Sequence, residues 1–197
     1  MSKILQLKIT LKHTKPAVFR TVQVLSTSNF LELHIVIQIV MLWENSHLHE
    51  FKFKNYRISE LFEESDDEWS EGVIDSKEVV VGEVITKGDK LTYEYDFGDS
   101  WIHEIKVEKE LPAEPGVFYP RCIDGAMQSP PEDCGGIPGF LSLVELMKGE
   151  KNEEYDEMVE WLGEPFDPTE FDLDGVNELL IDVFNEIEKN KNGNSDQ

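Results

Sequence analysis

The sequence is poor in cysteine, in positive charge and in long apolar runs. Its two cysteines, Cys122 and Cys134, are too few for the disulfide framework of a secreted scaffold of 197 residues. No stretch approaches the roughly 18 apolar residues of a membrane span, and residues 1–8 lack the pattern of a signal peptide. We therefore expect a cytoplasmic protein without a membrane span, whose cysteines are thiols or metal ligands. A single Cys122–Cys134 disulfide stays open as an alternative.

Basic residues are outnumbered, since 18 Lys and Arg stand against 41 Asp and Glu and give a net charge of −23. Such a charge repels phosphate backbones, so nucleic acid is a poor partner, whereas a protein could bind through the acidic surface. The charge is uneven: residues 1–57 carry eight basic and three acidic side chains, a net +5, which leaves −28 for the remainder. Solvated faces without a partner are the plainer interpretation.

Hydrophobic and polar residues alternate at the start of the chain, which predicts a sheet. Residues 5–11 have this period of two, and Val18, Val22 and Val24 predict an antiparallel partner and hence a β-hairpin. Three further strands are predicted over residues 47–53, 91–95 and 101–107, the last two joined by a Phe-Gly-Asp-Ser turn.

Helical periodicity predicts one helix within the sheet region and about three at the end of the chain. Asn29 and Glu32 match a capping box before the first, over residues 30–43. The later helices are predicted over residues 140–148, 153–162 and 174–188. The predicted fold class is α+β: a mixed, mainly antiparallel sheet made of a β-hairpin, a helix and three further strands, with a C-terminal helical lobe.

These patterns divide the chain into four segments. Residues 1–111 form the predicted sheet domain, with an acidic insertion at residues 60–78. Residues 112–138 are a Pro/Gly-rich segment that contains both cysteines. Residues 139–189 are the helical lobe, expected to pack on the sheet, and residues 190–197 are expected to be a disordered tail.

Three histidines in predicted strands suggest a metal site. His47 and His49 are two residues apart, which would place both imidazoles on one side of a strand, and His103 lies on another. On neighbouring strands the three could converge and bind zinc with Cys122 or Cys134. The eleven residues between the cysteines do not match a zinc knuckle. The plainer interpretation is that the histidines pack in the core with hydrogen bonds to backbone or to nearby acids.

A second group of reactive side chains lies between residues 93 and 103. Its aspartates and tyrosines could supply carboxylates and phenols for acid–base chemistry. A structural tight turn around Gly98 is the plainer explanation for the aspartates. No catalytic residue is assigned, and the candidate site residues are Tyr93, Asp96, Asp99, Trp101, Glu50 and Arg121.

Motifs of the common cofactor classes do not occur in the sequence. It has no Walker loop, dinucleotide fingerprint, His-Glu-x-x-His or Gly-x-Ser-x-Gly elbow, so those classes lose support. Trp43, Trp101 and Trp161 are expected in the core, whereas Trp69, in the acidic insertion, is a candidate for an exposed contact with a partner.

Several long phrases together resemble one family. They are TKPAVFR (14–20), WENSHLHEF (43–51), YEYDFGDSWIHEI (93–105), LPAEPGVFYPRC (111–122), PPEDCGGIPGF (130–140) and WLGEPFDPTEFDLDGVN (161–177). The chain resembles the Ri-plasmid open-reading-frame-three-like family, whose members are often labelled transposon passenger proteins of a TnpR type. It departs from the family at Phe19, where members usually have Trp. The family's signature falls on Trp43, His47, His49, Glu50, Asp96, Gly98, Asp99, Trp101, His103, Pro120, Arg121, Cys122, Asp133, Cys134 and Gly135.

The resemblance implies an accessory protein associated with mobile elements. We expect a non-catalytic interaction or binding module. The alternative is a metal-dependent, zinc-type enzyme such as a hydrolase, with the three histidines and a cysteine or aspartate as ligands. A second alternative is an accessory protein of DNA recombination. The TnpR label suggests a resolvase, but only three arginines, Arg20, Arg57 and Arg121, and acidic terminal helices do not match a serine recombinase.

Overall fold

The computed structural model describes residues 3–61 and 71–193, and it is built on one eight-stranded sheet. The strand order is β5-β4-β3-β6-β7-β1-β2-β8, and every neighbouring pair is antiparallel except β4 with β5. The strands are β1 (Lys3–Leu11), β2 (Phe19–Leu25), β3 (His49–Phe53), β4 (Tyr56–Ser59), β5 (Val73–Asp75), β6 (Lys90–Tyr95), β7 (Trp101–Pro112) and β8 (Arg121–Ala126). The helices are α1 (Phe30–Met41), α2 (Val81–Val84), α3 (Gly136–Lys148), α4 (Glu153–Leu162) and α5 (Leu173–Gly193).

The α+β fold class is therefore confirmed. The predicted hairpin forms from β1 and β2, which pair with Leu7 opposite Val22. β1 is an interior strand of the sheet, because its other edge pairs with the distant strand β7. The short strands β4 and β5 and the strand β8 were not predicted from the sequence.

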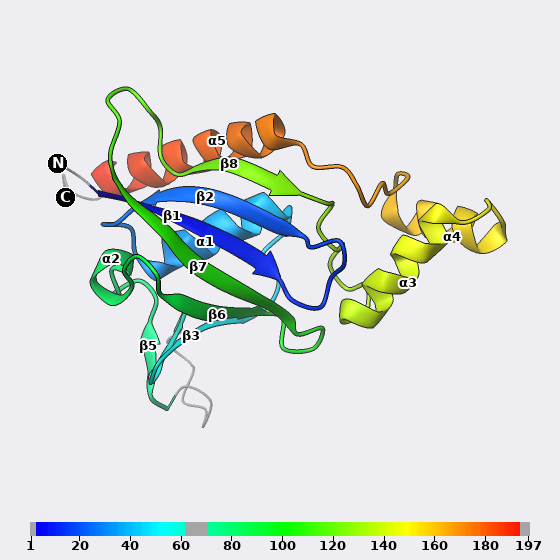
Figure 1. Ribbon diagram of the computed structural model, residues 1–197, viewed down its shortest axis with the longest axis horizontal. Helices are drawn as coiled ribbons and strands as arrows, with labels where there is room; N and C mark the ends of the chain where they lie inside the picture. Colours follow the sequence, from blue (N-terminus) through cyan, green and yellow to red (C-terminus); the bar gives the residue numbers. More distant parts are fainter. Residues whose placement is uncertain (1–2, 62–70, 194–197) are drawn as a thin grey trace.

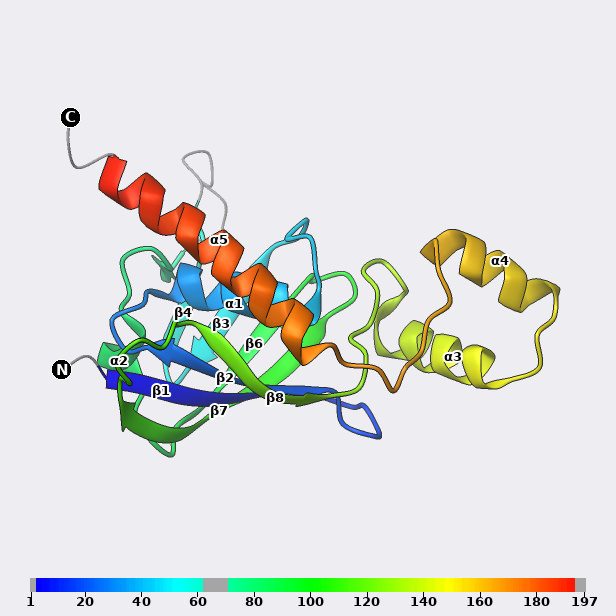
Figure 2. The ribbon, with the colours of Figure 1, turned by 90° about the horizontal axis from the view of Figure 1, so that it is seen from above.

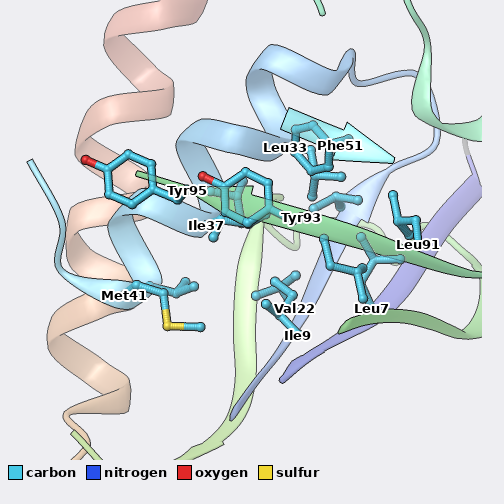
Figure 3. Close-up of a cluster of buried hydrophobic side chains, with 14 of the residues drawn as sticks. Leu7, Ile9, Val22, Leu33, Ile37, Met41, Phe51, Leu91, Tyr93 and Tyr95 are labelled. Carbon is cyan, nitrogen blue, oxygen red and sulfur yellow. The ribbon is translucent and has the colours of Figure 1, made fainter. Parts of the chain in front are cut away.

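Helix α1 covers one face of the sheet and begins with the predicted capping box. The Asn29 side chain accepts a hydrogen bond from the Glu32 amide, and the Glu32 carboxylate accepts one from the Asn29 amide. Between helix and sheet lies the core, where side chains of β1, β2 and α1 meet those of β3 and β6 (Figure 3). The labelled members of this cluster are Leu7, Ile9, Val22, Leu33, Ile37, Met41, Phe51, Leu91, Tyr93 and Tyr95.

The opposite face of the sheet carries polar side chains. The Gln23 amide nitrogen donates to the Gln6 side-chain oxygen at 3.2 Å, and Lys90 pairs with Glu104 at 3.0 Å across β6 and β7. Leu5, Leu7, Ile9 and Leu11 thus lie in the core and alternate with polar side chains on the opposite face, where Gln6 and Gln23 are themselves buried.

The three late helices lie in two places. Helix α5 runs along β8 and α1, and the Asn177 side chain exchanges hydrogen bonds with the backbone of Cys122, each 2.9 Å long (Figure 1). Helices α3 and α4 form a hairpin that projects beyond the end of the sheet (Figure 2). Helix α5 continues through Gly193, into the segment expected to be a tail.

Residues 62–70 of the acidic insertion, which include Trp69, lie outside the described residues. The described part of the insertion contains β5, which pairs in parallel with β4. Within residues 3–61 and 71–193, no helix combines the length and the hydrophobicity that crossing a membrane requires.

Candidate metal centre

The first strand of the predicted histidine site begins later than expected. β3 starts at His49, so His47 lies in the loop between α1 and β3, and the prediction that the two share one side of a strand is wrong. His49 is buried and its ring stacks on His34, with ring centroids 3.5 Å apart and planes 8° from parallel. His47 and His49 therefore belong to different elements, a loop and a strand.

His49 and His103 lie two strands apart in the sheet. His49 pairs with Tyr95, which pairs with Trp101, and the neighbouring rung joins Tyr93 to His103. Adjacent strands are about 4.8 Å apart, so β6 separates the two imidazoles by roughly 10 Å. Trp101, which belongs to the first of these rungs, is fully buried. The structure thus does not bring His49 and His103 to one point.

Both histidines are held in the neutral state. Burial lowers the pKa of His49 to about 2, with the nearby His34 adding to the effect, and burial lowers the pKa of His103 to about 3. His103 Nδ1 donates to the Trp101 carbonyl oxygen at 3.0 Å. The Nε2 atoms of both residues are buried and have no hydrogen-bond partner among the described residues.

The two cysteines lie in different parts of the molecule. Cys122 is buried on β8 against α5, whereas Cys134 lies in the loop before α3, and both are free thiols. Burial, and next the charge of Asp99, raises the pKa of the Cys134 thiol to about 12. Burial also raises the pKa of Cys122. Because a metal binds the thiolate, both environments oppose ligation.

Glu50 is buried with its charge balanced. Its carboxylate is 2% exposed and lies 2.7 Å from Lys52 Nζ and 2.7 Å from Arg57 Nε. A carboxylate with two cationic partners is stabilised in its ionised form and has little capacity left for a ligand. Glu50 therefore serves as the centre of an ion-pair network on β3.

Tyr93 and Arg121 are engaged in separate networks. The Tyr93 hydroxyl is buried and accepts from Gln38 Nε2 at 3.0 Å. Arg121 lies on β8, at the edge of the sheet remote from β3, where it donates to Gln23 at 2.8 Å and pairs with Glu114 at 3.3 Å. The structure does not bring these two residues together.

Three other side chains do converge. His47, Asp96 and Asp133 each offer one ligand atom, and these atoms lie within 4.8 Å of one another. His47 Nδ1 lies 3.9 Å from Asp96 Oδ1, and His47 Nε2 lies 3.3 Å from Asp133 Oδ1. They come from the α1–β3 loop, the β6–β7 turn and the loop before α3. Of the predicted site residues, His47 and Asp96 thus belong to one cluster.

Tyr95 organises the backbone around this cluster. Its hydroxyl accepts from the Ser46 amide at 3.0 Å and from the His47 amide at 3.3 Å, and it donates to Glu132. The Tyr95 ring stacks on Trp43, with centroids 4.9 Å apart. One phenol therefore ties the loop that carries His47 to the loop that carries Asp133.

The β6–β7 turn positions Asp96, the third member of this cluster. Asp96 has a left-handed backbone, with φ 56°, and its Oδ1 accepts from the Gly98 amide at 2.9 Å. Asp99 Oδ2 accepts from the Gly135 amide at 3.2 Å, which holds the turn against the loop before α3. The aspartates thus serve as turn residues, and Asp96 also faces His47.

Asp133 was absent from the candidate site residues derived from the sequence. It lies 37 residues after Asp96 in a Pro/Gly-rich segment with no regular spacing to a histidine. Its position in the family signature was the signal that could have identified it. Trp161, expected in the core, is 53% exposed on α4, so that prediction is wrong.

The comparisons with known proteins agree over nearly the whole chain. The family model described as plasmid pRiA4b ORF-3-like protein matches residues 3–175. The chain is 34% identical over 186 residues to the uncharacterized protein y4hQ of Sinorhizobium fredii (strain NBRC 101917 / NGR234), with 93% of each protein covered. It is also similar to the crystal structure of MM3350, a protein of unknown function from Methanosarcina mazei Go1. That likeness has a TM-score of 0.78 and 36% identity, and it covers 88% of this chain and 97% of the other. The chain therefore belongs to the plasmid pRiA4b ORF-3-like protein family.

Proposed function

We propose that this protein is a binding module with a divalent metal centre at His47, Asp96 and Asp133. The observation that carries the proposal is the convergence of one imidazole and two carboxylates from three separate segments, with ligand atoms within 4.8 Å of one another. A neutral imidazole and two carboxylates suit zinc, and also manganese or iron(II).

The distance between His47 and Asp133 supports a shared ion. Two ligands about 2.0–2.1 Å from a tetrahedral zinc are roughly 3.3 Å apart. His47 Nε2 and Asp133 Oδ1 are 3.3 Å apart, yet this buried nitrogen makes no hydrogen bond within the described residues. An ion between the two atoms would satisfy both. The Asp133 side chain is 73% exposed and can rotate to close the remaining distance.

The test is metal binding by the full chain. After dialysis against EDTA, isothermal titration with Zn²⁺ or Mn²⁺ should give one site per chain. We expect His47→Ala and Asp133→Asn to weaken binding about tenfold or more. Asp96→Asn should do the same without disturbing the turn, because asparagine tolerates the left-handed backbone and keeps an oxygen for Gly98.

Asp156→Asn is the matched control, since this carboxylate is exposed on α4 and lies outside the cluster. The Asp156→Asn variant should bind metal with the same affinity as the unaltered chain. Tight binding that survives both His47→Ala and Asp96→Asn would place the ion elsewhere and refute the centre.

A metal-dependent hydrolase is the second candidate. Three protein ligands leave coordination positions for water and substrate, as in catalytic zinc sites. The observation that favours it is the groove next to the cluster, to which Asp133 and Glu132 both contribute. Hydrolysis of p-nitrophenyl acetate or bis-p-nitrophenyl phosphate that depends on metal and disappears in Asp96→Asn would support it. Turnover unaffected by that variant would count against it.

Three further observations bear on the role and the location of the protein. The word plasmid in the family description supports an accessory role in mobile elements. The free thiols of Cys122 and Cys134 support a cytoplasmic location. The net charge of −23 opposes binding to phosphate backbones, so a role in DNA recombination receives the least support.

A further inference from the structure

A groove of about 580 Å³ lies between the end of α1, the loop after β8 and the end of α4. One wall comes from the end of α1 and the loop that follows it, the floor from residues 128–133, and the other wall from residues 161–166 at the end of α4. Ligand sites of proteins have volumes of about 300–1,000 Å³ and occur preferentially where two parts of a structure meet. The groove therefore has the size and place of a binding site.

Carboxylates line this groove on every side. Glu44, Glu132, Asp133 and Glu164 all contribute to it, and none of the described residues that line it is Lys, Arg or His. Glu132 is held by Tyr95 and by the Glu44 amide. The carboxylates of Glu44 and Glu164 are exposed and form no ion pair within residues 3–61 and 71–193. Carboxylates gathered at one concave surface raise the local concentration of cations.

The groove is also lined by the exposed indole of Trp161. Trp161 is 53% exposed and lines the groove together with Phe166. Tryptophan is enriched among the residues that dominate binding energies, and its face attracts a guanidinium or ammonium group. An aromatic face with carboxylates around it is the arrangement that binds arginine, whose planar cation can stack and pair at once.

We propose that the groove binds an extended segment of a partner protein through arginine side chains. The guanidinium stacks on Trp161 and pairs with Glu44 and Glu164, while the chain follows the floor formed by residues 128–133. The charge of the lining selects this occupant over an acidic peptide or a nucleic acid. The proposal does not rest on the metal centre, although Asp133 borders both.

The experiment measures the fluorescence anisotropy of a labelled hexapeptide of alternating glycine and arginine, with the full chain in EDTA. The same peptide with citrulline in place of arginine keeps the shape and removes the charge, and it should not bind. Trp161→Ala should weaken binding of the arginine peptide about two- to fivefold, and Trp161→Phe should restore part of the loss. EDTA keeps the result independent of the metal proposal.

A pair of double variants separates the groove from the net charge. Glu44→Gln/Glu164→Gln removes two charges from the groove, whereas Glu178→Gln/Glu186→Gln removes two exposed charges from α5. The first should weaken binding several times more than the second. Equal effects of the two double variants, binding of the citrulline peptide, or equal displacement by spermine at the same charge concentration would each overturn the proposal.

Discussion

Arg20 is 1% exposed and forms no ion pair with any described residue. Its Nε donates to the Val40 carbonyl at 2.9 Å, and its Nη2 donates to Ser129 Oγ at 2.8 Å. The Phe171 ring covers the guanidinium, with its centroid 3.9 Å away. Burial lowers the pKa of Arg20 to about 10, so the side chain stays charged at neutral pH and joins β2, α1 and the loop after β8.

Replacement of Arg20 should destabilise the folded protein. In Arg20→Met the carbonyl of Val40 and the hydroxyl of Ser129 lose a buried donor, so we expect the free energy of unfolding to fall by about 2–4 kcal/mol. Urea denaturation followed by circular dichroism measures it. Arg121→Met is the matched control and should cost less than Arg20→Met, because Arg121 is partly exposed and its ion-pair partner Glu114 is largely exposed. Equal losses of unfolding free energy in the two variants would contradict the inference that burial makes the hydrogen bonds of Arg20 important for stability.

Three buried histidines make stability depend on pH. Burial lowers the pKa of His34 to about 4, of His103 to about 3 and of His49 to about 2. In the unfolded chain each would titrate near pH 6.5. Between these values the unfolded state binds more protons than the folded state, so stability rises with pH in this range.

We therefore expect the urea midpoint to fall as the pH is lowered from about 6.5 to about 4. The free energy of unfolding should change by about 4 kcal/mol per pH unit if all three histidines contribute, since each proton contributes about 1.4 kcal/mol per unit. His49→Gln should reduce the slope by about one third. A slope that is unchanged in this variant would show that other groups control acid unfolding.

At the scale of elements, the first turn of α3 lies directly against the β6–β7 turn. Gly136 has a φ of 66°, and a Cβ at this position would lie 2.7 Å from the Asp99 carbonyl oxygen. Gly116 has a similar φ of 76°, but nothing lies within 4 Å of a Cβ there. The two glycines thus share a backbone conformation and differ in their contacts.

Gly116→Ala should destabilise the protein by about 1 kcal/mol, the cost of a left-handed alanine. Gly136→Ala should cost at least about 3 kcal/mol, because overpacking against backbone adds to the same conformational term. Chemical denaturation of both variants provides the comparison. If the two losses are alike, the approach of α3 to Asp99 is not tight.

The elements with strong local signals could be predicted from the sequence. The capping box at Asn29 located α1, and the predicted bounds of α4 are those of the structure, because its polar and apolar residues repeat with a helical period. The strand β8 was missed since its neighbours are prolines and glycines and its partner β2 is distant in the chain. Pairing across such a distance leaves no local pattern.

The site was predicted only in part for a related reason. His47 and Asp96 were recognised as polar residues of interest, but their partner Asp133 is brought to them by the tertiary fold. His49 and His103 have the same residue type as His47, yet their strands bury them among aromatic rings. The type of a residue indicates which chemistry its side chain can perform. The fold decides which other side chains lie near it, and the sequence does not show this.

At the scale of the whole molecule, opposite charges from distant parts of the chain meet on the sheet. Lys52 pairs with Glu94 at 3.1 Å, Lys3 with Glu110 at 3.6 Å and Lys12 with Glu104 at 4.0 Å. The basic strands near the start of the chain thereby neutralise part of the acidic remainder. The chain as a whole keeps a net charge of −23, because acidic residues outnumber basic ones.

We expect self-repulsion to outweigh these surface pairs, so added salt should stabilise the protein. Raising NaCl from about 20 mM to about 0.5 M shortens the Debye length from roughly 20 Å to roughly 4 Å and should increase Tm at pH 7. Near pH 4.4, the pI calculated from the sequence, the increase should vanish. A Tm that falls with NaCl at pH 7 would mean that the ion pairs dominate.

The interior position of β1 in the sheet has a consequence for biosynthesis. Lys3 pairs with Pro112 and Leu11 with His103, so the sheet cannot close until the ribosome has released residue 112. Until then the nascent hairpin exposes an unpaired edge, and a two-stranded hairpin alone is marginally stable. The emerging chain must therefore protect its first strands until residue 112 has been made, and the lysines on β1 discourage their pairing with neighbouring chains.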